Sequence, residues 1–362
     1  MSNIGEFDLI ERISAQFRDN QANGAGTLGI GDDCAVLPQR EGLDTLVTTD
    51  LLIEERHFLL SDISPWQLGW KSAAVNISDI AAMGGRPEAT FLSIALPKKF
   101  PSKVHPSGAG TTDAVPVADW VDEFIGGFKA LSERFGVPLL GGDTSASPDK
   151  LFINVTVLGS CPHGAAILRS GAKAGDLICV TGPLGDAGAG LKLILDRAAS
   201  PDGSVASGGQ ASCHSERSRG IFSLQEQTLI RRHYEPVPRV AEGIALRECG
   251  GVHAMMDISD GIASDLRHIL KASGALGADI DLKILPLSDE LRRVCSARGW
   301  DPYELAVSGG EDYELLLTIA PEALEKARQA VGSLSVIGRI TRGPGIRWEG
   351  GSHKDYKGFT HF

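Results

Sequence analysis

The sequence has no excess of positive charge and no long uninterrupted apolar run. Its 362 residues carry a formal net charge of −11. This balance argues against a nucleic-acid-binding protein, because such proteins need a basic surface to meet phosphates. No stretch approaches the roughly 18 consecutive apolar residues of a membrane span, and the N-terminus lacks the apolar core of a secretory signal. We therefore expect no membrane partner, no nucleic-acid partner and a cytoplasmic location.

Paired cysteines and the familiar nucleotide-binding loops are also missing. The six cysteines are scattered, without a CxxC pair, which argues against structural zinc and favours buried thiols in a reducing compartment. No GxxxxGK[ST] motif and no HRD or DFG set is present, which excludes P-loop enzymes and protein kinases. Residues 24–29 match GxGxxG by letter, but they neither follow a strand nor open a helix, so a dinucleotide-binding fold is not indicated.

Strand and helix patterns are mixed in both halves of the chain without strict alternation. Ser64 and Pro65 mark a helix start, and Gly136 marks a helix stop. We predict an α+β fold of two domains, residues 1–160 and 161–362, with mixed or antiparallel sheets and flanking helices. The predicted helices are residues 6–17, 65–83, 119–135, 186–199, 238–249, 260–273 and 321–331, the predicted strands are 43–49, 90–97, 151–160, 176–181, 252–257, 278–284, 313–320 and one last strand, and residues 141–144 are predicted as a turn.

Two segments resemble inserted loops. Residues 102–117 and 200–222 are rich in Ser, Gly, Ala and Pro and show no periodicity. Segments of this composition bury little apolar surface. We predict that both are mobile and carry no chemistry.

A repeated pattern of small residues followed by acids is the most informative feature. One such pair is usually a turn or a helix cap. Six of them in a chain without a basic excess are hard to explain as turns, and carboxylate oxygens beside glycine suit Mg²⁺. The six are Gly31-Asp32-Asp33, Thr48-Thr49-Asp50, Ser78-Asp79, Gly141-Gly142-Asp143-Thr144, Asp257-Ile258-Ser259-Asp260-Gly261 and Ser308-Gly309-Gly310-Glu311-Asp312.

Three further residues have both a functional and a structural interpretation. Asp79 lies between Ile77 and Ile80 in an apolar helix, where a carboxylate is either a buried cap or a metal ligand. Arg169 precedes a strand and is either a bidentate phosphate clamp or part of a surface turn. His57 follows the Thr-Thr-Asp turn and either contacts an anionic substrate or is structural, and the residues alone leave these alternatives open.

The order of these motifs resembles a known family from end to end, apart from the two inserts. The quoted set is GEFDLI, GIGDDCAVL, TTD, LGWKSAAVNISDIAAMGG, LLGGDTS, RSGAKAGD, MDISDGIASDL, AVSGGEDYELL and KGFTHF. It is similar to the thiamine-monophosphate kinases of the aminoimidazole ribonucleotide synthetase-like ATP-binding superfamily. The resemblance implies in-line transfer of the ATP γ-phosphoryl group to thiamine monophosphate, several Mg²⁺ ions, a homodimer paired through the N-terminal domains, and a site between the domains.

The resemblance also implies roles for individual residues. Phe359 departs from the relatives, which often carry another aromatic there, so stacking is retained and a hydroxyl contact is lost. Asp50, Asp143 and Arg169 are expected to be essential for catalysis. The implied metal ligands are Asp33, Thr48, Thr49, Asp50, Asp79, Asp143, Asp257 and Asp260; the ATP contacts are Gly142, Asp143, Arg169 and Ser259; the substrate contacts are His57, Glu311 and Phe359.

Two alternatives remain at this point. One is another ATP-dependent enzyme of the superfamily, making selenophosphate or an aminoimidazole nucleotide; the first cysteine, Cys34, directly follows an acidic turn and fits the selenophosphate enzymes poorly. The other is a non-catalytic sensor of nucleotides or thiamine phosphates. A sensor would not need the full set of acids, which argues against it.

Overall fold

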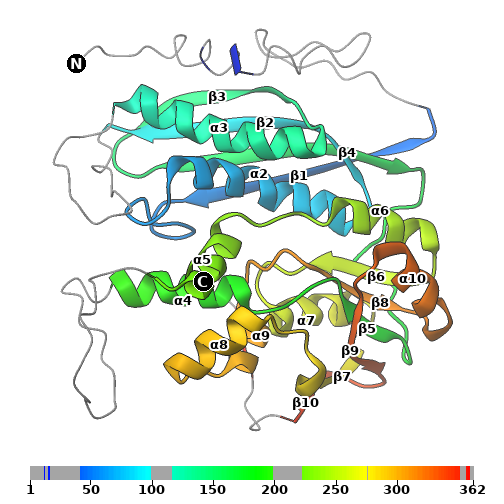
Figure 1. Cartoon of the computed structure of the whole chain (residues 1–362). Helices are drawn as coiled ribbons and strands as arrows, with labels where there is room; N and C mark the ends of the chain where they lie inside the picture. Colours follow the sequence, from blue (N-terminus) through cyan, green and yellow to red (C-terminus); the bar gives the residue numbers. More distant parts are fainter. Residues whose placement is uncertain are drawn as a thin grey trace, which may run out of the picture.

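Two β-sheets form the framework of the protein, and Figure 1 shows them with their helices as two units along the chain. The computed structural model describes residues 12, 15–16, 41–98, 116–198, 222–274, 276–350 and 356–358. We call the sheet of β1–β4 with helices α2 and α3 the first unit, and the sheet of β5–β10 with the remaining helices the second unit. In these described parts, no helix is long and apolar enough to cross a membrane.

The four strands of the first sheet run in the order β1-β4-β2-β3. β4 pairs antiparallel with β1 and β2, and β3 pairs parallel with β2. Side chains alternate along β1: Leu46 and Leu52 are buried, while Val47 is 63% and Leu51 49% exposed. The sheet therefore has one covered face and one open face. The bounds are β1 Leu43–Ile53, β2 Arg86–Pro97, β3 Leu139–Ser147 and β4 Phe152–Pro162.

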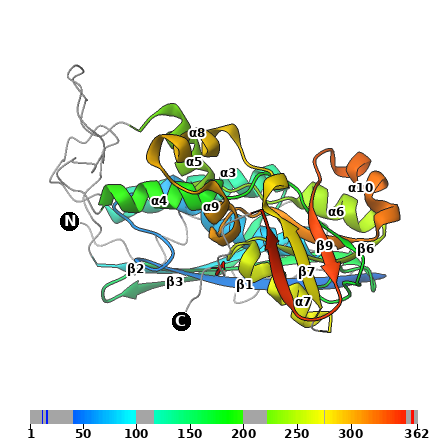
Figure 2. The ribbon, with the colours of Figure 1, turned by 90° about the horizontal axis from the view of Figure 1, so that it is seen from below.

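Helices α2 (Pro65–Ala82) and α3 (Val117–Phe135) belong to the covered side of this sheet, where Figure 2 shows α3. The start of α2 follows from its sequence, because the Ser64 hydroxyl accepts from the Gln67 backbone while the Gln67 side chain accepts from the Ser64 backbone. Helix α3 stops at Gly136, whose φ of 65° is left-handed. Most of α2 is buried on every side, as expected for a helix lying between a sheet and other helices.

The two helices approach closely through glycine, and Figure 1 shows them adjacent. A Cβ atom at Gly127 would lie 1.7 Å from the carbonyl oxygen of Trp66, and one at Gly69 would lie 1.8 Å from that of Phe124. Neither backbone can yield without moving its helix. We therefore expect Gly127→Ala to lower the free energy of unfolding by about 1–3 kcal/mol, measured by urea titration.

The next residue along α3 supplies the control for this substitution. A Cβ at Gly126 meets its nearest neighbour, Trp66 Cδ1, at 3.6 Å, which is an ordinary contact. Gly126→Ala should therefore leave stability unchanged or raise it slightly, because alanine favours helix. Equal losses in the two variants would show that the close approach is not what requires glycine.

The six strands of the second sheet run in the order β10-β7-β9-β5-β8-β6. β10 and β7 are parallel, and the other neighbours are antiparallel. The bounds of the second unit are β5 Leu177–Val180, α4 Asp186–Ala198, α5 Leu224–Tyr234, α6 Val240–Cys249, β6 Val252–Asp257, α7 Ile262–Ala272, β7 Gly277–Asp281, α8 Asp289–Arg298, α9 Pro302–Ser308, β8 Leu315–Ile319, α10 Leu324–Val331, β9 Ser335–Thr341 and β10 Gly345–Glu349, with short 3₁₀ turns at Leu282–Ile284 and Pro321–Ala323.

Helix α6 connects the second unit to the first. A Cβ at Gly243 would lie 2.2 Å from the Ala81 carbonyl oxygen, so α6 touches the end of α2. The Arg247 guanidinium donates to the Gly84 carbonyl oxygen at 2.9 Å. The two units are thus held against each other through α2.

The mixed α+β architecture is confirmed, and several local predictions are wrong. Residues 141–144 lie inside strand β3 and form no turn, because pairing with β2 overrides the turn preference of Gly-Gly-Asp. Helices α5, α8 and α9 were not expected, and the last strand is two strands, β9 and β10. The helix predicted over 6–17 and both inserts fall almost wholly outside the described residues. At the insert ends, Val117 begins α3 and Phe222 packs beside α5.

Candidate active site

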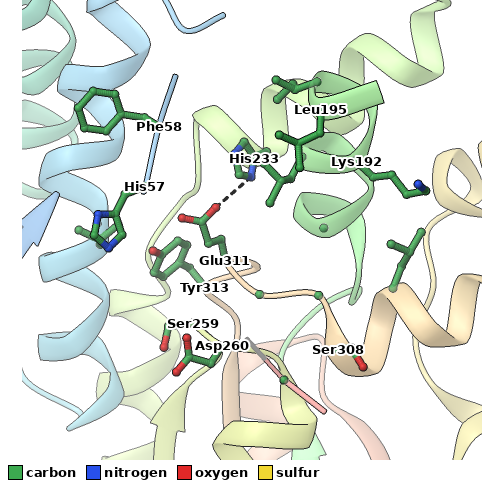
Figure 3. Close-up of a pocket in the computed structure, with 18 of the residues that line it drawn as sticks. His57, Phe58, Lys192, Leu195, His233, Ser259, Asp260, Ser308, Glu311 and Tyr313 are labelled. Atoms are coloured by element: carbon green, nitrogen blue, oxygen red, sulfur yellow. Dashed lines mark ion pairs between the residues drawn. The ribbon is translucent and has the colours of Figure 1, made fainter. Parts of the chain in front are cut away.

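A cleft of about 1130 Å³ opens between the two units. Its lining comes from the end of β1 and the turn after it, from α2, α4, α5 and α9, and from the turn after β6. Figure 3 shows His57, Glu311, Ser259 and Asp260 reaching one common space from these separate segments. A cleft of this size has room for two small-molecule ligands side by side.

Three carboxylates from distant segments meet at this cleft: Asp50 on β1, Asp79 on α2 and Asp257 at the end of β6. Burial and the charge of Asp79 raise the pKa of Asp50 to about 6. Burial, and again the charge of Asp79, raises the pKa of Asp257 to about 7. The acids therefore repel one another, and a bound cation would relieve that repulsion.

Hydroxyl groups hold two of these acids in place. The Thr48 hydroxyl donates to Asp79 Oδ2 at 2.5 Å, and the Ser78 hydroxyl donates to Asp257 Oδ2 at 2.7 Å. Burial raises the pKa of Asp79, and the Thr48 bond works in the opposite direction. Arg169 lines the same cleft. Its positive charge lowers the pKa of both Asp79 and Asp257.

The donor set fits a hard divalent cation. Carboxylate and hydroxyl oxygens are the ligands that Mg²⁺ prefers, and Mg²⁺ commonly keeps waters and phosphate oxygens in place of a full protein cage. Among the described residues, no three acidic, histidine or cysteine side chains converge tightly enough to hold a metal ion by themselves. The chemistry of the site therefore fits Mg²⁺ completed by waters and phosphate oxygens.

The turn after β6 is braced by backbone bonds to the loop before β8. Glu311 N–H donates to the Ser259 carbonyl oxygen at 2.8 Å. Asp260 N–H donates to the carboxylate of Asp265, a residue of α7 that is 1% exposed. Burial and the charge of Asp257 raise the pKa of Asp265 to about 8. Ser259 and Asp260 are thereby held at the cleft on a fixed backbone.

His57 and Glu311 lie at another part of the same cleft. The Ile53 backbone N–H donates to His57 Nδ1 at 2.9 Å. This bond fixes the orientation of the imidazole ring. Glu311 Oε2 accepts from Lys71 Nζ at 2.9 Å and lies 3.0 Å from His233 Nδ1. Figure 3 shows Glu311 directed toward His233, with Tyr313 beside it.

Three predicted residues, Thr49, Gly142 and Asp143, do not line the cleft. Cα pairing across the sheet puts Asp143 in one row with Ser93, Asn154 and Leu51, on the open face. The Thr49 hydroxyl accepts from Asn154 Nδ2 on that face. Gly142 is adjacent on β3, where a Cβ would lie 1.7 Å from the Leu92 carbonyl oxygen, so the sheet itself requires glycine.

The predicted site residues thus fall into three groups. Asp33 and Phe359 lie outside the described residues, although Lys357 and Gly358, the neighbours of Phe359, line the cleft. Thr49, Gly142 and Asp143 do not line it. The structure brings to it Asp50, His57, Asp79, Arg169, Asp257, Ser259, Asp260 and Glu311, with Thr48 bonded to Asp79.

The sequence reasoning missed two residues of this site: His233, which lines the cleft, and Lys71, which is buried beside it. Lys71 lies in the apolar helix that drew attention to Asp79, and the same argument about a charge among apolar residues applies to it. His233 lies on α5, whose Ser223 and Glu226 form a capping box, a signal that follows the low-complexity residues directly. The sequence therefore holds a signal for Lys71 and for the helix that carries His233, but none that puts His233 in the cleft.

Comparison with known proteins gives a consistent result. Residues 31–161 match the family model "AIR synthase related protein, N-terminal domain", and residues 173–349 match "AIR synthase related protein, C-terminal domain". The thiamine-monophosphate kinase of Escherichia coli strain K12 is 37% identical over 367 residues, covering 99% of this chain and 98% of that protein.

Solved structures agree over the same length. The thiamine-monophosphate kinase of Stenotrophomonas maltophilia K279a superposes with a TM-score of 0.76 at 33% identity, covering 94% of this chain and 96% of that one. AaThiL complexed with AMPPCP and TMP superposes with a TM-score of 0.72 at 30% identity, covering 100% and 98%.

Proposed function

This chain belongs to the thiamine-monophosphate kinase family, and we propose that the cleft between its two units is where it transfers the terminal phosphoryl group of ATP to thiamine monophosphate. The products are thiamine diphosphate and ADP. The structural relative with AMPPCP and TMP bound supports a site that takes a nucleotide and an acceptor together. A cytoplasmic location is part of the same proposal.

The observation that carries this proposal is the meeting of three carboxylates with one arginine. Asp50, Asp79 and Asp257 come from segments more than 200 residues apart at the extremes, and the charge of Asp79 raises the pKa of both Asp50 and Asp257. Such acids suit a site that holds cations, and cations together with Arg169 suit a site that holds two polyphosphate groups.

The reaction itself needs no general base. A phosphate oxygen of thiamine monophosphate bonds to the γ-phosphorus of ATP, and the bond from that phosphorus to the β,γ-bridging oxygen breaks, its electron pair leaving with ADP. The acceptor phosphate loses its second proton near pH ~6, so it is already a nucleophile at neutral pH. Positioning and charge stabilisation therefore account for catalysis.

The residues of the cleft divide these tasks. Arg169 would bind phosphoryl oxygens, and its fork of donors would hold them in line for transfer. Ser259, on its braced turn, would contact ATP, while His57 and Glu311 would contact the acceptor. Asp50, Asp79, Asp257 and Asp260 would hold Mg²⁺, which supplies neutralisation of the phosphate charges when it is bound.

The direct test uses purified protein with ATP, Mg²⁺ and thiamine monophosphate. We expect thiamine diphosphate and ADP in equal amounts, with no ATP consumption when the acceptor is left out. Tight ATP binding without any thiamine diphosphate would favour a sensor and overturn the proposal.

A homodimer would explain how Asp143 reaches a nucleotide. The open face of the first sheet, which carries Asp143 on β3, also carries exposed apolar side chains on β1, including Val47 and Leu51. Exposed apolar residues on one face suit burial against a second copy. We propose that the dimer forms through this face and that Asp143 of one chain completes the nucleotide site of its partner.

Mixing two inactive variants tests this arrangement. Asp50→Asn and Asp143→Asn should each be nearly inactive alone. After exchange of subunits, half of the dimers carry one chain of each kind, and one of their two sites is free of both changes. We therefore expect about a quarter of the wild-type rate on mixing, by two-fold symmetry. Verified exchange of subunits without any recovery would show that Asp143 serves its own chain.

A further inference from the structure

A fully buried lysine lies beside the cleft and is not explained by phosphate binding. Lys71 is 0% exposed within α2. A buried ammonium group is costly unless it is paired and hydrogen-bonded. Lys71 Nζ meets this need at Glu311 Oε2, at 2.9 Å, and lies 3.5 Å from His233 Nε2.

The helix that carries Lys71 is itself fastened at this point. The Gln67 amide donates to Glu235 Oε1 at 3.0 Å, and the Trp70 indole N–H donates to the Pro236 carbonyl oxygen at 2.7 Å. Residues 67, 70 and 71 lie on one face of α2, since side chains three and four apart are neighbours on a helix. Lys71 therefore presents its charge from a fixed position in the first unit to a loop of the second.

Glu311 has an unusual backbone conformation, and its N–H donates to the Ser259 carbonyl oxygen. Its φ is 64°, in the left-handed region that residues with a side chain rarely adopt, and the φ of Tyr313 is 50°. Burial is the largest single influence on the pKa of Glu311 and acts to raise it, but the charge of Lys71, its hydrogen bond and the nearby histidines together lower the pKa overall. Burial and the nearby Lys71 lower the pKa of His233 to about 3, so the imidazole is neutral. The carboxylate is therefore an anion in a fixed place.

Among the described residues, both polar contacts of the Glu311 carboxylate fall on the same one of its two oxygens. Lys71 and His233 both approach Oε2. In Figure 3 the other oxygen is directed to the side of the cleft where His57 lies. A carboxylate repels phosphate, so its natural counterpart is a cationic ring or an amino group. Thiamine monophosphate has both, in its thiazolium and aminopyrimidine rings.

We propose that Lys71 is a positioning residue for thiamine recognition: it holds Glu311 as an anion aimed at the cationic, amino-bearing part of the acceptor. The proposal rests on the proposed function, since it takes the cleft as the thiamine monophosphate site. Lys71 then determines affinity for the acceptor and has little effect on binding of ATP.

Steady-state kinetics of Lys71→Met, Glu311→Gln and the double variant test this role. We expect Lys71→Met to raise KM for thiamine monophosphate by about 10- to 100-fold, the effect of losing a charged hydrogen bond, with KM for ATP changed less than about twofold. Glu311→Gln should raise the same KM, and adding Lys71→Met to it should change KM by less than about twofold, because the two residues act as one unit.

Arg239→Met is the matched control. Arg239 pairs with the buried Glu314 between segments of the second unit, and neither residue lines the cleft. Breaking that pair should lower thermal stability and leave KM for thiamine monophosphate unchanged. If Lys71→Met lowers thermal stability in the same way and does not selectively raise the KM for thiamine monophosphate, the role of Lys71 is purely structural. That result would overturn the proposal.

The double variant keeps the test decisive if Lys71→Met does not fold. It carries no unpaired buried charge, so it should fold where the single variant fails. A KM for thiamine monophosphate differing tenfold or more between Glu311→Gln and the double variant would show that Lys71 does not act through Glu311. If the wild-type protein forms no thiamine diphosphate, the proposed function itself is overturned. The two failures are therefore distinguishable.

Discussion

Asp50→Asn is expected to lower kcat by about 10²–10³-fold with the fold intact, the size of effect seen when one group that stabilises transition-state charge is removed. Asparagine keeps the shape of the side chain but loses the charge that would hold Mg²⁺ beside the transferring phosphoryl group. The measurement is the rate of thiamine diphosphate formation at saturating ATP, acceptor and Mg²⁺.

The same substitution should stabilise the metal-free protein. Burial and Asp79 raise the pKa of Asp50 to about 6, so its anionic form is disfavoured in the folded state at neutral pH. Removing that charge should raise the melting temperature without Mg²⁺, while the wild type should gain more than the variant when Mg²⁺ is added. The opposite signs for activity and stability distinguish a ligand-binding acid from a structural one.

Asp279→Asn is the control for this prediction. Asp279 lies on β7 and pairs with Arg347 on the second sheet, and it does not line the cleft. Its replacement should change neither the rate nor the response to Mg²⁺. A near-normal rate for Asp50→Asn at saturating Mg²⁺ would remove Asp50 from the metal site.

Arg169→Ala is expected to lower kcat by about 10³-fold or more, as for an arginine that stabilises charge on a transferring phosphoryl group. Arg169 lines the cleft, and its charge lowers the pKa of Asp79 and Asp257. Lysine at this position should restore only part of the rate, because it keeps the charge and loses the bidentate fork. Single-turnover formation of thiamine diphosphate measures the chemical step directly.

Lys173→Ala gives a matched control four residues along the same segment. Lys173 is exposed, and its Nζ lies 3.0 Å from His253 Nε2, away from the cleft. We expect its loss to change the rate less than about twofold. Arg169→Ala within tenfold of the wild type would mean that Arg169 belongs to a surface turn.

Much of the fold could be predicted where a local signal is strong. Ser64 and Pro65 start α2, and Gly136 ends α3, because caps and left-handed glycine are local chemistry. The turn predicted at residues 141–144 was wrong, because its partner strand lies 50 residues earlier in β2. Helix α5 was missed because it directly follows a low-complexity segment.

The candidate site could be predicted only in part. Asp79 was singled out because a carboxylate in an apolar helix needs a partner, and it does lie in the cleft. Lys71, eight residues earlier, obeys the same rule and was overlooked. The roles of Asp143 and Thr49 stay predictions, and both residues lie on the open face of the sheet.

The sequence by itself determined the family, the α+β class and the chemistry available, because the order and spacing of acidic and glycine motifs are properties of the chain. Only the tertiary structure decided which acids act together. Alternation along a strand puts Asp50 and Thr49 on opposite faces, but the packing of distant helices determines which face becomes a cleft. In the same way, the contact of Lys71 with Glu311 joins residues 240 positions apart, and no local pattern indicates it.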